Sequence, residues 1–273
     1  MNRDIRVHLL PALFEPEEVR DGIAVILDIL RASTTIVHAL ANGADCVIPT
    51  LSVEEARETA SELQRSAERS TPNPPKTQSS SRDACGFAPP SILLGGERDG
   101  ILIDGFHLDN NPFAYTPDVV RGKTIVFTTT NGTQALHRAA MADRVLIGSF
   151  VNLQAIVDVL AEDQRPIHLV CAGTKGKITI EDALCAGAIV DRLLEEFGRR
   201  DDDLADDQAQ LALHRYLTAS TSDAEFLRAM RNSYGGRNCR RLGFDDQIVR
   251  AATFDLFDVV PEYDARTGQI TVG

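Results

Sequence analysis

Hydrophobic and polar positions follow one another along this chain in blocks of strand length and helix length. The run IAVILDIL, residues 23–30, is apolar except for Asp28. A run without polar alternation is typical of a strand that is covered on both faces, as in a parallel sheet. The next residues, RASTTIVHALANGA, predict a turn and then a helix that ends at Asn42 and Gly43.

The same order of strand, turn and helix recurs along the chain. DCVIPT predicts a short strand, and SVEEARETASELQRSAER predicts a helix whose Ser52 and Glu55 have the spacing of a capping box. DLFDVVPEYDARTGQITVG predicts a terminal strand or hairpin. Small or polar residues separate an apolar strand from a helix in three units, at residues 25–41, 124–140 and 167–190.

This alternation predicts an α/β fold with a mainly parallel sheet, flanked by helices in three layers, α/β/α. A mixed sheet is the alternative. We expect a single α/β domain over residues 1–273, with two similar lobes as the alternative organisation. Residues 70–90, STPNPPKTQSSSRDACGFAPP, are rich in Pro and Ser and predict a surface insertion.

Composition and charge narrow the class of protein. The formal net charge of −12 argues against a nucleic-acid binder, although arginines or a metal ion can still make one cleft attractive to a small anion. No window holds the ~18–20 apolar residues of a membrane helix, and the start lacks a signal-peptide pattern. The five cysteines are scattered, which favours reduced thiols and a cytoplasmic protein. We expect a homodimer, a common state of soluble enzymes.

The stretch KTIVFTTTNGTQAL, residues 123–136, ends an apolar run in three threonines and an Asn-Gly. In open α/β sheets ligands bind at the carboxyl ends of strands, where helix starts offer backbone amides to an anion. STT at residues 33–35 and AGTKGK at residues 172–177 have the same character. The three stretches together predict an anion site. A simple tight turn at Asn131 and Gly132 is the alternative, and no stretch matches a P-loop.

Asp28 is the strongest single candidate for a catalytic or metal-binding residue. A carboxylate near the end of an apolar strand is costly to bury as an ion unless it is paired or bound to a metal. Asp28 would be a Mg²⁺ ligand or a nucleophile, with Arg31 as a clamp for phosphate or carboxylate. A plain salt bridge between Asp28 and Arg31 is the alternative.

Other charged residues have a structural explanation of equal weight. Glu97 and Arg98 follow a predicted strand, where they belong either to a site edge or to a solvated loop. Glu181 and Asp182 open a predicted helix, where acids favour the helix dipole or bind a metal.

Basic and sulfur-bearing residues complete the set of candidates. Arg237, Arg240 and Arg241 form a local basic cluster for an anionic substrate, or else a salt-bridged surface helix. Cys171 is a possible nucleophile at a strand end, but free cysteines are more often small buried residues. The histidines show no metal-binding spacing.

Taken together, these motifs resemble the 2-phosphosulfolactate phosphatase family of the coenzyme M pathway. The resemblance implies a Mg²⁺-dependent α/β phosphatase that hydrolyses (2R)-2-phospho-3-sulfolactate to 3-sulfolactate and phosphate. The matching stretches follow the family's order from about residue 23 to residue 261: LDILRASTTIVHALANGA, GGERDG, GFHLDNNP, TTTNGTQAL, CAGTKGKITIEDALCAG and SYGGRNCRRLGF.

The motif positions and the residue chemistry give a set of expected site residues. Catalytic roles fall to Asp28, Arg31 and Asn131. The expected metal ligands are Asp28, Glu97, Glu181 and Asp182. Phosphate or substrate would be bound by Thr34, Thr35, Arg98, Thr129, Thr130, Gly132 and Arg237. The nucleophile is either a water at the metal or Asp28 itself.

The chain also departs from the family's pattern. GFHLDNNP replaces a loop that usually reads like GFDLGNSP, and Gln247 stands where an acid is expected. Such loops shape selectivity, so these departures bear on the substrate more than on the chemistry. Two rival functions remain. One is a Mg²⁺-dependent phosphatase for another small phosphorylated hydroxy acid, such as phospholactate or phosphoglycolate, and the other is a non-catalytic anion-binding module.

Overall fold

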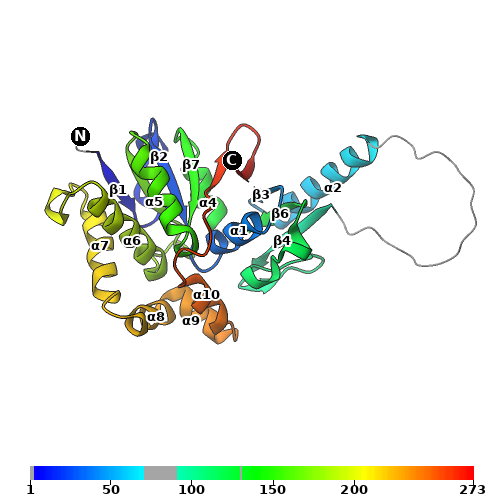
Figure 1. Ribbon diagram of the computed structural model, residues 1–273. Helices are drawn as coiled ribbons and strands as arrows, with labels where there is room; N and C mark the ends of the chain where they lie inside the picture. The colour runs from blue at the N-terminus through cyan, green and yellow to red at the C-terminus, as the bar shows by residue number, and fades with distance from the viewer. Residues whose placement is uncertain (1–2, 71–90, 130) are drawn as a thin grey trace, which may run out of the picture.

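The computed structural model describes residues 3–70, 91–129 and 131–273. The insertion predicted at residues 70–90 therefore lies, beyond Ser70, outside the described residues. Within them, one sheet has the strand order β1-β8-β2-β7-β9-β10-β3-β6-β4-β5 (Figure 1). Its strands are β1 Ile5–His8, β2 Ile23–Leu27, β3 Cys46–Thr50, β4 Ile92–Arg98, β5 Ile101–Leu102, β6 Thr124–Thr128, β7 Arg144–Gly148, β8 Ile167–Cys171, β9 Pro261–Asp264 and β10 Gln269–Val272.

The sheet consists of two parallel blocks joined by a hairpin. Strands β1, β8, β2 and β7 pair in parallel, and so do β3, β6 and β4. Strands β9 and β10 form an antiparallel hairpin that pairs with β7 on one side and β3 on the other. Because three antiparallel pairings separate β7 from β3, the two blocks run in opposite senses. The predicted mainly parallel sheet, in its mixed form, and the predicted hairpin are confirmed.

Helices cover both faces of the first block, as predicted for three layers. On β2, Ile23, Val25 and Leu27 pack with α5 and α6, whereas Ala24 and Ile26 pack with α1 and α4. Every position of this strand is apolar because neither face meets water. The α-helices of the described residues are α1 Ala32–Ala41, α2 Val53–Ser70, α3 Pro117–Val120, α4 Gly132–Arg138, α5 Leu153–Glu162, α6 Ile180–Glu196, α7 Asp207–Ala219, α8 Asp223–Asn232, α9 Tyr234–Arg241 and α10 Asp245–Ala251.

Helix α2 covers the second block. Its Ala56 packs with Val126 of β6, on the face opposite to Phe127, which belongs to the cluster around α1 and α4. The Ser52 hydroxyl accepts a hydrogen bond from the Glu55 N–H at 3.0 Å, which confirms the predicted start of this helix. Throughout the residues that the structure describes, no helix is long and apolar enough to cross a membrane.

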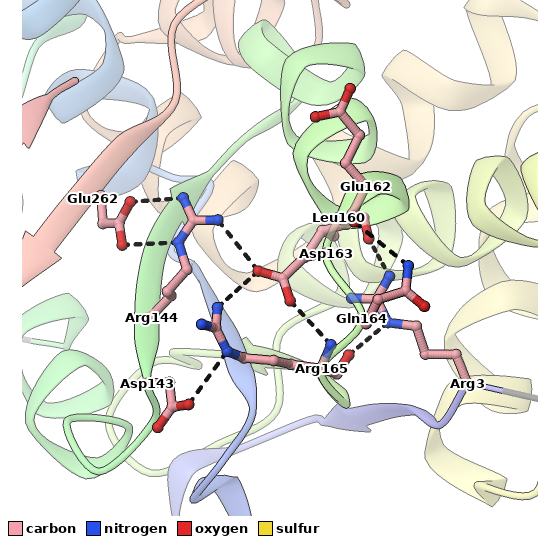
Figure 2. Close-up of polar contacts among 9 residues, drawn as sticks. All are labelled: Arg3, Asp143, Arg144, Leu160, Glu162, Asp163, Gln164, Arg165 and Glu262. Atoms are coloured by element: carbon pink, nitrogen blue, oxygen red, sulfur yellow. Dashed lines mark hydrogen bonds and ion pairs between the residues drawn. The ribbon is translucent and has the colours of Figure 1, made fainter.

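A network of ion pairs fixes the hairpin to the first block (Figure 2). Arg144 in β7 donates Nε to one oxygen of Glu262 in β9 at 3.0 Å and Nη2 to the other at 2.7 Å. Its Nη1 donates to Asp163, which also accepts from Arg165. Strand β9 meets β7 at only two residue pairs. The bidentate contact therefore strengthens a short ladder at the point where the two blocks are joined.

Strand β2 ends at Leu27, three residues before the end of the predicted run. The Ser33 hydroxyl accepts a hydrogen bond from the Asp28 N–H at 2.9 Å and donates one to the Ile26 carbonyl at 3.2 Å. These bonds take up backbone groups that a longer strand would offer to its neighbours, so the chain leaves the sheet here. Asp28 is therefore the first residue after the strand.

Helices α6 and α7 approach each other closely at Gly187. A Cβ atom at this position would lie 2.2 Å from the carbonyl oxygen of Ala212 and 2.7 Å from Cβ of Tyr216. A backbone oxygen cannot rotate away as a flexible side chain can. The absence of a side chain at Gly187 therefore sets the distance between the two helices.

We expect Gly187→Ala to lower the free energy of unfolding by about 2 kcal/mol in urea denaturation, because overpacking outweighs the gain of about 1 kcal/mol in helix propensity. Glu196→Ala, on an exposed position of the same helix, is the matched control and should unfold at the wild-type urea concentration. A Gly187→Ala protein as stable as that control would show that α7 can shift at no cost.

Candidate active site

A cavity of about 300 Å³ lies where loops from both parallel blocks meet. Its walls come from the loops after β2, β6 and β8, from the end of β4 with the turn that follows it, and from α9. Because the blocks run in opposite senses, the site is not one edge of a simple parallel sheet. Five of the sequence-predicted site residues line this cavity: Asp28, Arg31, Glu97, Thr129 and Asn131.

Asp28 is held at the start of α1 and lies among other carboxyl groups. It is only 8% exposed, and its Oδ1 accepts a long hydrogen bond from the Ala32 N–H at 3.4 Å. Burial raises the pKa of Asp28 well above its usual range, and the charges of Asp182, Glu97 and Glu181 raise it further. The four carboxyl groups therefore make this end of the cavity attractive to a cation.

Asp182 connects three segments of the site. Its Oδ1 accepts a hydrogen bond from the Ile29 N–H at 2.9 Å, and its Oδ2 accepts from the Gly173 N–H at 3.0 Å and the Thr179 hydroxyl at 2.7 Å. Burial nevertheless raises the pKa of Asp182 to about 6. Since both oxygens are already bonded, Asp182 orients the loops after β2 and β8 and has little capacity left to bind a metal.

Glu181 lies next to it on the first turn of α6 and has one oxygen to spare. Its Oε1 accepts a hydrogen bond from the Gly235 N–H at 2.8 Å. Its Oε2 is buried and has no hydrogen-bond partner among the described residues. Burial, followed by the charge of Asp182, raises the pKa of Glu181 to about 7. A buried oxygen of this kind is a natural ligand for a cation.

Arg31 is buried, and its guanidinium is fixed by neutral partners. Nη1 donates to Oε1 of Gln247 at 2.7 Å and Nη2 donates to the Gly100 carbonyl at 3.0 Å, while Cζ lies 5.2 Å from the centre of the Phe244 ring. In the described chain Arg31 forms no ion pair with Asp28, so the simple salt bridge is not found. Gln247, at a position where an acid was expected, holds the guanidinium without neutralising it.

The loop after β6 brings a hydroxyl and a bare backbone to Asp28. The Thr129 hydroxyl is buried and has no partner among the described residues. A Cβ atom on Gly132 would lie 2.9 Å from Oδ2 of Asp28, so any larger residue would displace the Asp28 carboxylate from its present position. Oδ1 of Asn131 accepts a hydrogen bond from the Lys175 N–H at 3.0 Å and so joins this loop to the one after β8. Thr130 lies outside the described residues.

The two predicted threonines of α1 do not line the cavity. The Thr34 hydroxyl donates to the Ile29 carbonyl at 2.9 Å and lies 2.9 Å from the Ser149 hydroxyl. The Thr35 hydroxyl points to the Asn110 carbonyl at 3.4 Å. Both side chains thus bond to neighbouring segments, and they support the loops of the site from behind.

Two predicted arginines also lie outside the cavity lining. Arg98 donates to the Glu97 carbonyl at 2.8 Å and to the Thr128 hydroxyl at 3.1 Å. Arg237 is exposed and donates to the Asn232 carbonyl at the end of α8. Arg241, one turn further along α9, does line the cavity, so the predicted basic cluster contributes through a different member.

Several lining residues were not among the site residues expected from the sequence. Asn110 belongs to the GFHLDNNP loop, and its Oδ1 is buried without a partner in the described chain. Lys175 belongs to the AGTKGK turn, whose anion-site character was the available signal. Asp99 and Asn238 also line the cavity. They belong to GGERDG and SYGGRNCRRLGF, and these family-like stretches were the available signal, although no role was assigned to either residue from the sequence.

Carboxyl and amide oxygens, the donors that Mg²⁺ prefers, lie in the cavity lining at Asp28 and Asn110 and behind it at Glu181, which bonds to the lining residue Gly235. Asp28, Oε2 of Glu181 and Oδ1 of Asn110 are hard donors, and the last two lack hydrogen-bond partners in the described chain. Mg²⁺ usually takes only one or two carboxylates and fills its remaining positions with water or substrate oxygens. Such completion is needed here, because the described residues include no group of three His, Cys, Asp or Glu placed to hold a metal.

Cys171, the last residue of β8, is buried and does not line the cavity. Burial raises the pKa of its thiol, and the charge of Asp182 raises it further. A thiol that stays protonated is a poor nucleophile. The alternative of a small buried cysteine therefore accounts for this residue.

Asp182→Ala tests whether the loops after β2 and β8 both depend on the Asp182 carboxylate. We expect hydrogen exchange at the Ile29 and Gly173 amides to accelerate about tenfold or more, because each loses its acceptor. Thr179→Val removes a donor to the same carboxylate and leaves both amides their acceptor, so it is the control. Unchanged exchange at both amides in Asp182→Ala would contradict this account.

The chain is similar to known proteins over nearly its whole length. Residues 8–266 match the family model described as 2-phosphosulpholactate phosphatase. A protein of Symbiobacterium thermophilum is 38% identical over 247 residues, which cover 90% of this chain and 93% of that protein. A protein of Caldicellulosiruptor saccharolyticus is 35% identical over 90% of each chain, and one of Thermotoga maritima is 36% identical over 93% of this chain and 94% of its own. All three carry the name "Probable 2-phosphosulfolactate phosphatase". The chain belongs to the 2-phosphosulfolactate phosphatase family.

Proposed function

We propose that this protein is a phosphoric monoester hydrolase that converts 2-phosphosulfolactate to 3-sulfolactate and phosphate. The observation that carries the proposal is the buried Asp28 carboxylate in a cavity that also holds the un-neutralised Arg31 and the unpartnered Thr129 hydroxyl. Membership of the family supports the choice of 2-phosphosulfolactate as substrate. The cavity volume of about 300 Å³ suits a small molecule.

In this proposal the phosphoryl group lies between Asp28, Thr129 and Arg31. Arg31 neutralises part of its charge, and the Thr129 hydroxyl donates to a phosphoryl oxygen. Such fixed donors stabilise the transition state because they need no reorganisation as charge moves. Gly132 leaves the space beside Oδ2 of Asp28 that the phosphoryl group requires.

Asp28 then takes a proton from the attacking water. The water oxygen bonds to phosphorus. The bond between phosphorus and the ester oxygen breaks, and that oxygen stays on the sulfolactate carbon. The electron pair of that bond stays on the alcohol oxygen, which takes a proton from solvent. Burial and the neighbouring carboxylates raise the pKa of Asp28, so its ionised form is a stronger base than an ordinary aspartate. The alternative, attack by Asp28 itself, would leave an aspartyl phosphate that hydroxylamine traps.

The proposal includes Mg²⁺, for which Asp28, Glu181 and Asn110 supply the oxygens. Bound there, Mg²⁺ would neutralise the phosphoryl oxygens and the surrounding carboxylates. Without a cation, a substrate with several negative charges would have to approach four carboxyl groups. This repulsion also weighs against a purely anion-binding protein, since carboxylates hinder anion binding unless a cation is present.

The first experiment measures phosphate release from 2-phosphosulfolactate and from 2-phospholactate, in Mg²⁺ and then in excess EDTA. We expect release that EDTA abolishes, with the larger kcat/KM for 2-phosphosulfolactate. A larger value for 2-phospholactate would assign the protein to another small phosphorylated hydroxy acid. Binding without release from either compound would make it a non-catalytic anion-binding module.

Asp28→Asn should lower kcat about a thousandfold, because the amide can neither take the proton nor carry the charge that attracts a cation. Asp104→Asn is the matched control: Asp104 is exposed and its side chain is outside the cavity lining, so its kcat should equal the wild-type value. Steady-state phosphate release measures both. A kcat for Asp28→Asn within threefold of the control would remove Asp28 from the mechanism.

Mg²⁺ should stabilise the folded protein more strongly at pH 8 than at pH 5. Burial raises the folded-state pKa values of Glu181 and Asp182 to about 7 and about 6, above their unfolded values. These groups therefore favour folding below about pH 4, and that contribution is lost as pH rises through 6 to 7. A bound cation compensates for this loss of stability at pH values at which the carboxylates are ionised.

Melting curves with and without MgCl₂ measure this effect. At pH 8 and a hundredfold excess over Kd we expect Tm to rise by roughly 5 °C, with a smaller rise at pH 5. NaCl at matched ionic strength is the control. A shift that NaCl reproduces, or one that is larger at pH 5, would contradict a Mg²⁺ site in this cluster.

A further inference from the structure

In the lining of the cavity the Asp99 carboxylate contacts one cation, Lys175, and lies within the electrostatic influence of a second, Arg241. Oδ1 of Asp99, in the turn after β4, is 3.0 Å from Nζ of Lys175, in the turn after β8. Arg241 of α9 lines the same cavity and donates to Oδ1 of Asn238 at 2.8 Å. The hydrogen bond and the charge of Lys175 lower the pKa of Asp99, and the charge of Arg241 lowers it further.

Both turns are anchored to residues of the proposed active site. The Lys175 N–H donates to Asn131, and the Gly100 N–H, next to Asp99, donates to Oε2 of Glu97 at 2.6 Å. Lys175 and Asp99 have φ angles of 52° and 53°, a conformation that few non-glycine residues adopt. The site therefore fixes the backbone of Lys175 and Asp99, while their side chains extend from it toward solvent and meet there.

The contact between the two side chains is exposed and easily exchanged. The Lys175 and Asp99 side chains are 59% and 76% exposed. Ion pairs this exposed contribute little to stability, because water screens the attraction and two flexible side chains must be ordered. An anion that is held elsewhere in the cavity by a second group is positioned in advance, as Asp99 is, and can therefore compete with Asp99 for Lys175.

We propose that Lys175 and Arg241 form the subsite for the sulfonate of the substrate, and that the Asp99 carboxylate occupies this subsite in the free protein. The inference rests on the proposed function, because the substrate's phosphoryl group is placed at Asp28. On binding, the sulfonate replaces the Asp99 carboxylate on Lys175, and Asp99 turns to solvent. The subsite selects for an anionic group on the carbon next to the phosphoester carbon.

Asp99 thus opposes binding, and Lys175 promotes it. Removing the two side-chain charges should change affinity in opposite directions, which a merely structural ion pair would not do. If the pair only held the turns in place, loss of either partner would weaken binding alike.

The experiment titrates 3-sulfolactate and lactate into the wild-type protein and its variants by calorimetry. Lys175→Gln should weaken 3-sulfolactate binding roughly tenfold, the loss of one charge-assisted contact, and leave lactate binding unchanged. Asp99→Asn should strengthen 3-sulfolactate binding severalfold, and asparagine tolerates the positive φ at this position. Lys177→Gln and Asp104→Asn are the controls, exposed residues of the same charges outside the cavity lining, and should bind like wild type.

Kinetics give a second measurement. Lys175→Gln should lower kcat/KM for 2-phosphosulfolactate roughly tenfold and leave kcat/KM for 2-phospholactate unchanged. Equal losses for both compounds, weaker binding in Asp99→Asn, or no binding of 3-sulfolactate to the wild-type protein would each overturn the inference. If the wild-type protein hydrolyses neither phosphoester, the proposed function fails, and the calorimetric comparison still decides whether the sulfonate subsite exists.

Discussion

The candidate active site depends on the Asp182 carboxylate and the groups that it binds. Its two oxygens accept hydrogen bonds from the Ile29 and Gly173 amides, in the loops after β2 and β8, and from the Thr179 hydroxyl at the start of α6. These loops carry Asp28, Arg31 and Lys175 to the cavity. A buried acceptor with three donors is satisfied only when all three segments are in place, so the position of each catalytic side chain depends on the others.

The same carboxylate creates the electrostatic problem of the site. The charges of Asp182, Glu97 and Glu181 raise the pKa of Asp28, and the charge of Asp182 raises the pKa of Glu181. The protein as a whole carries a net charge of −12. The positive charge of Arg31, which its neutral partners leave intact, offsets only part of this negative charge. Oε2 of Glu181 and Oδ1 of Asn110 are buried without hydrogen-bond partners in the described chain, and they are the oxygens that the proposed Mg²⁺ would use. Acidity and anion binding are therefore compatible here if a divalent cation is part of the site.

The sequence predicted those strands and site residues that depend only on residues close to them in the chain. Continuous apolar runs identified strands covered on both faces, and the polar residues after them identified Asp28, Thr129 and Asn131 at the cavity. The sequence could not predict that Thr34 and Thr35 face neighbouring segments, because the rotation of α1 about its axis depends on packing against β7 and the loop at Asn110. Nor could it pair Lys175 with Asp99, since 76 residues separate them and the contact arises from tertiary structure alone.

The opposite directions of the two parallel blocks have a consequence for how the protein folds. Only the hairpin of β9 and β10 joins β7 to β3 within the sheet, and these strands follow all the others in the described sequence. Helices α1 and α4 pack against strands of both blocks and can hold them together, but the two ladders can be connected only after the hairpin has been synthesised. Sheet pairings between distant segments form slowly. The walls of the cavity are thus aligned at a late step of folding, and an incomplete chain ending before the hairpin would hold the catalytic residues without their final geometry.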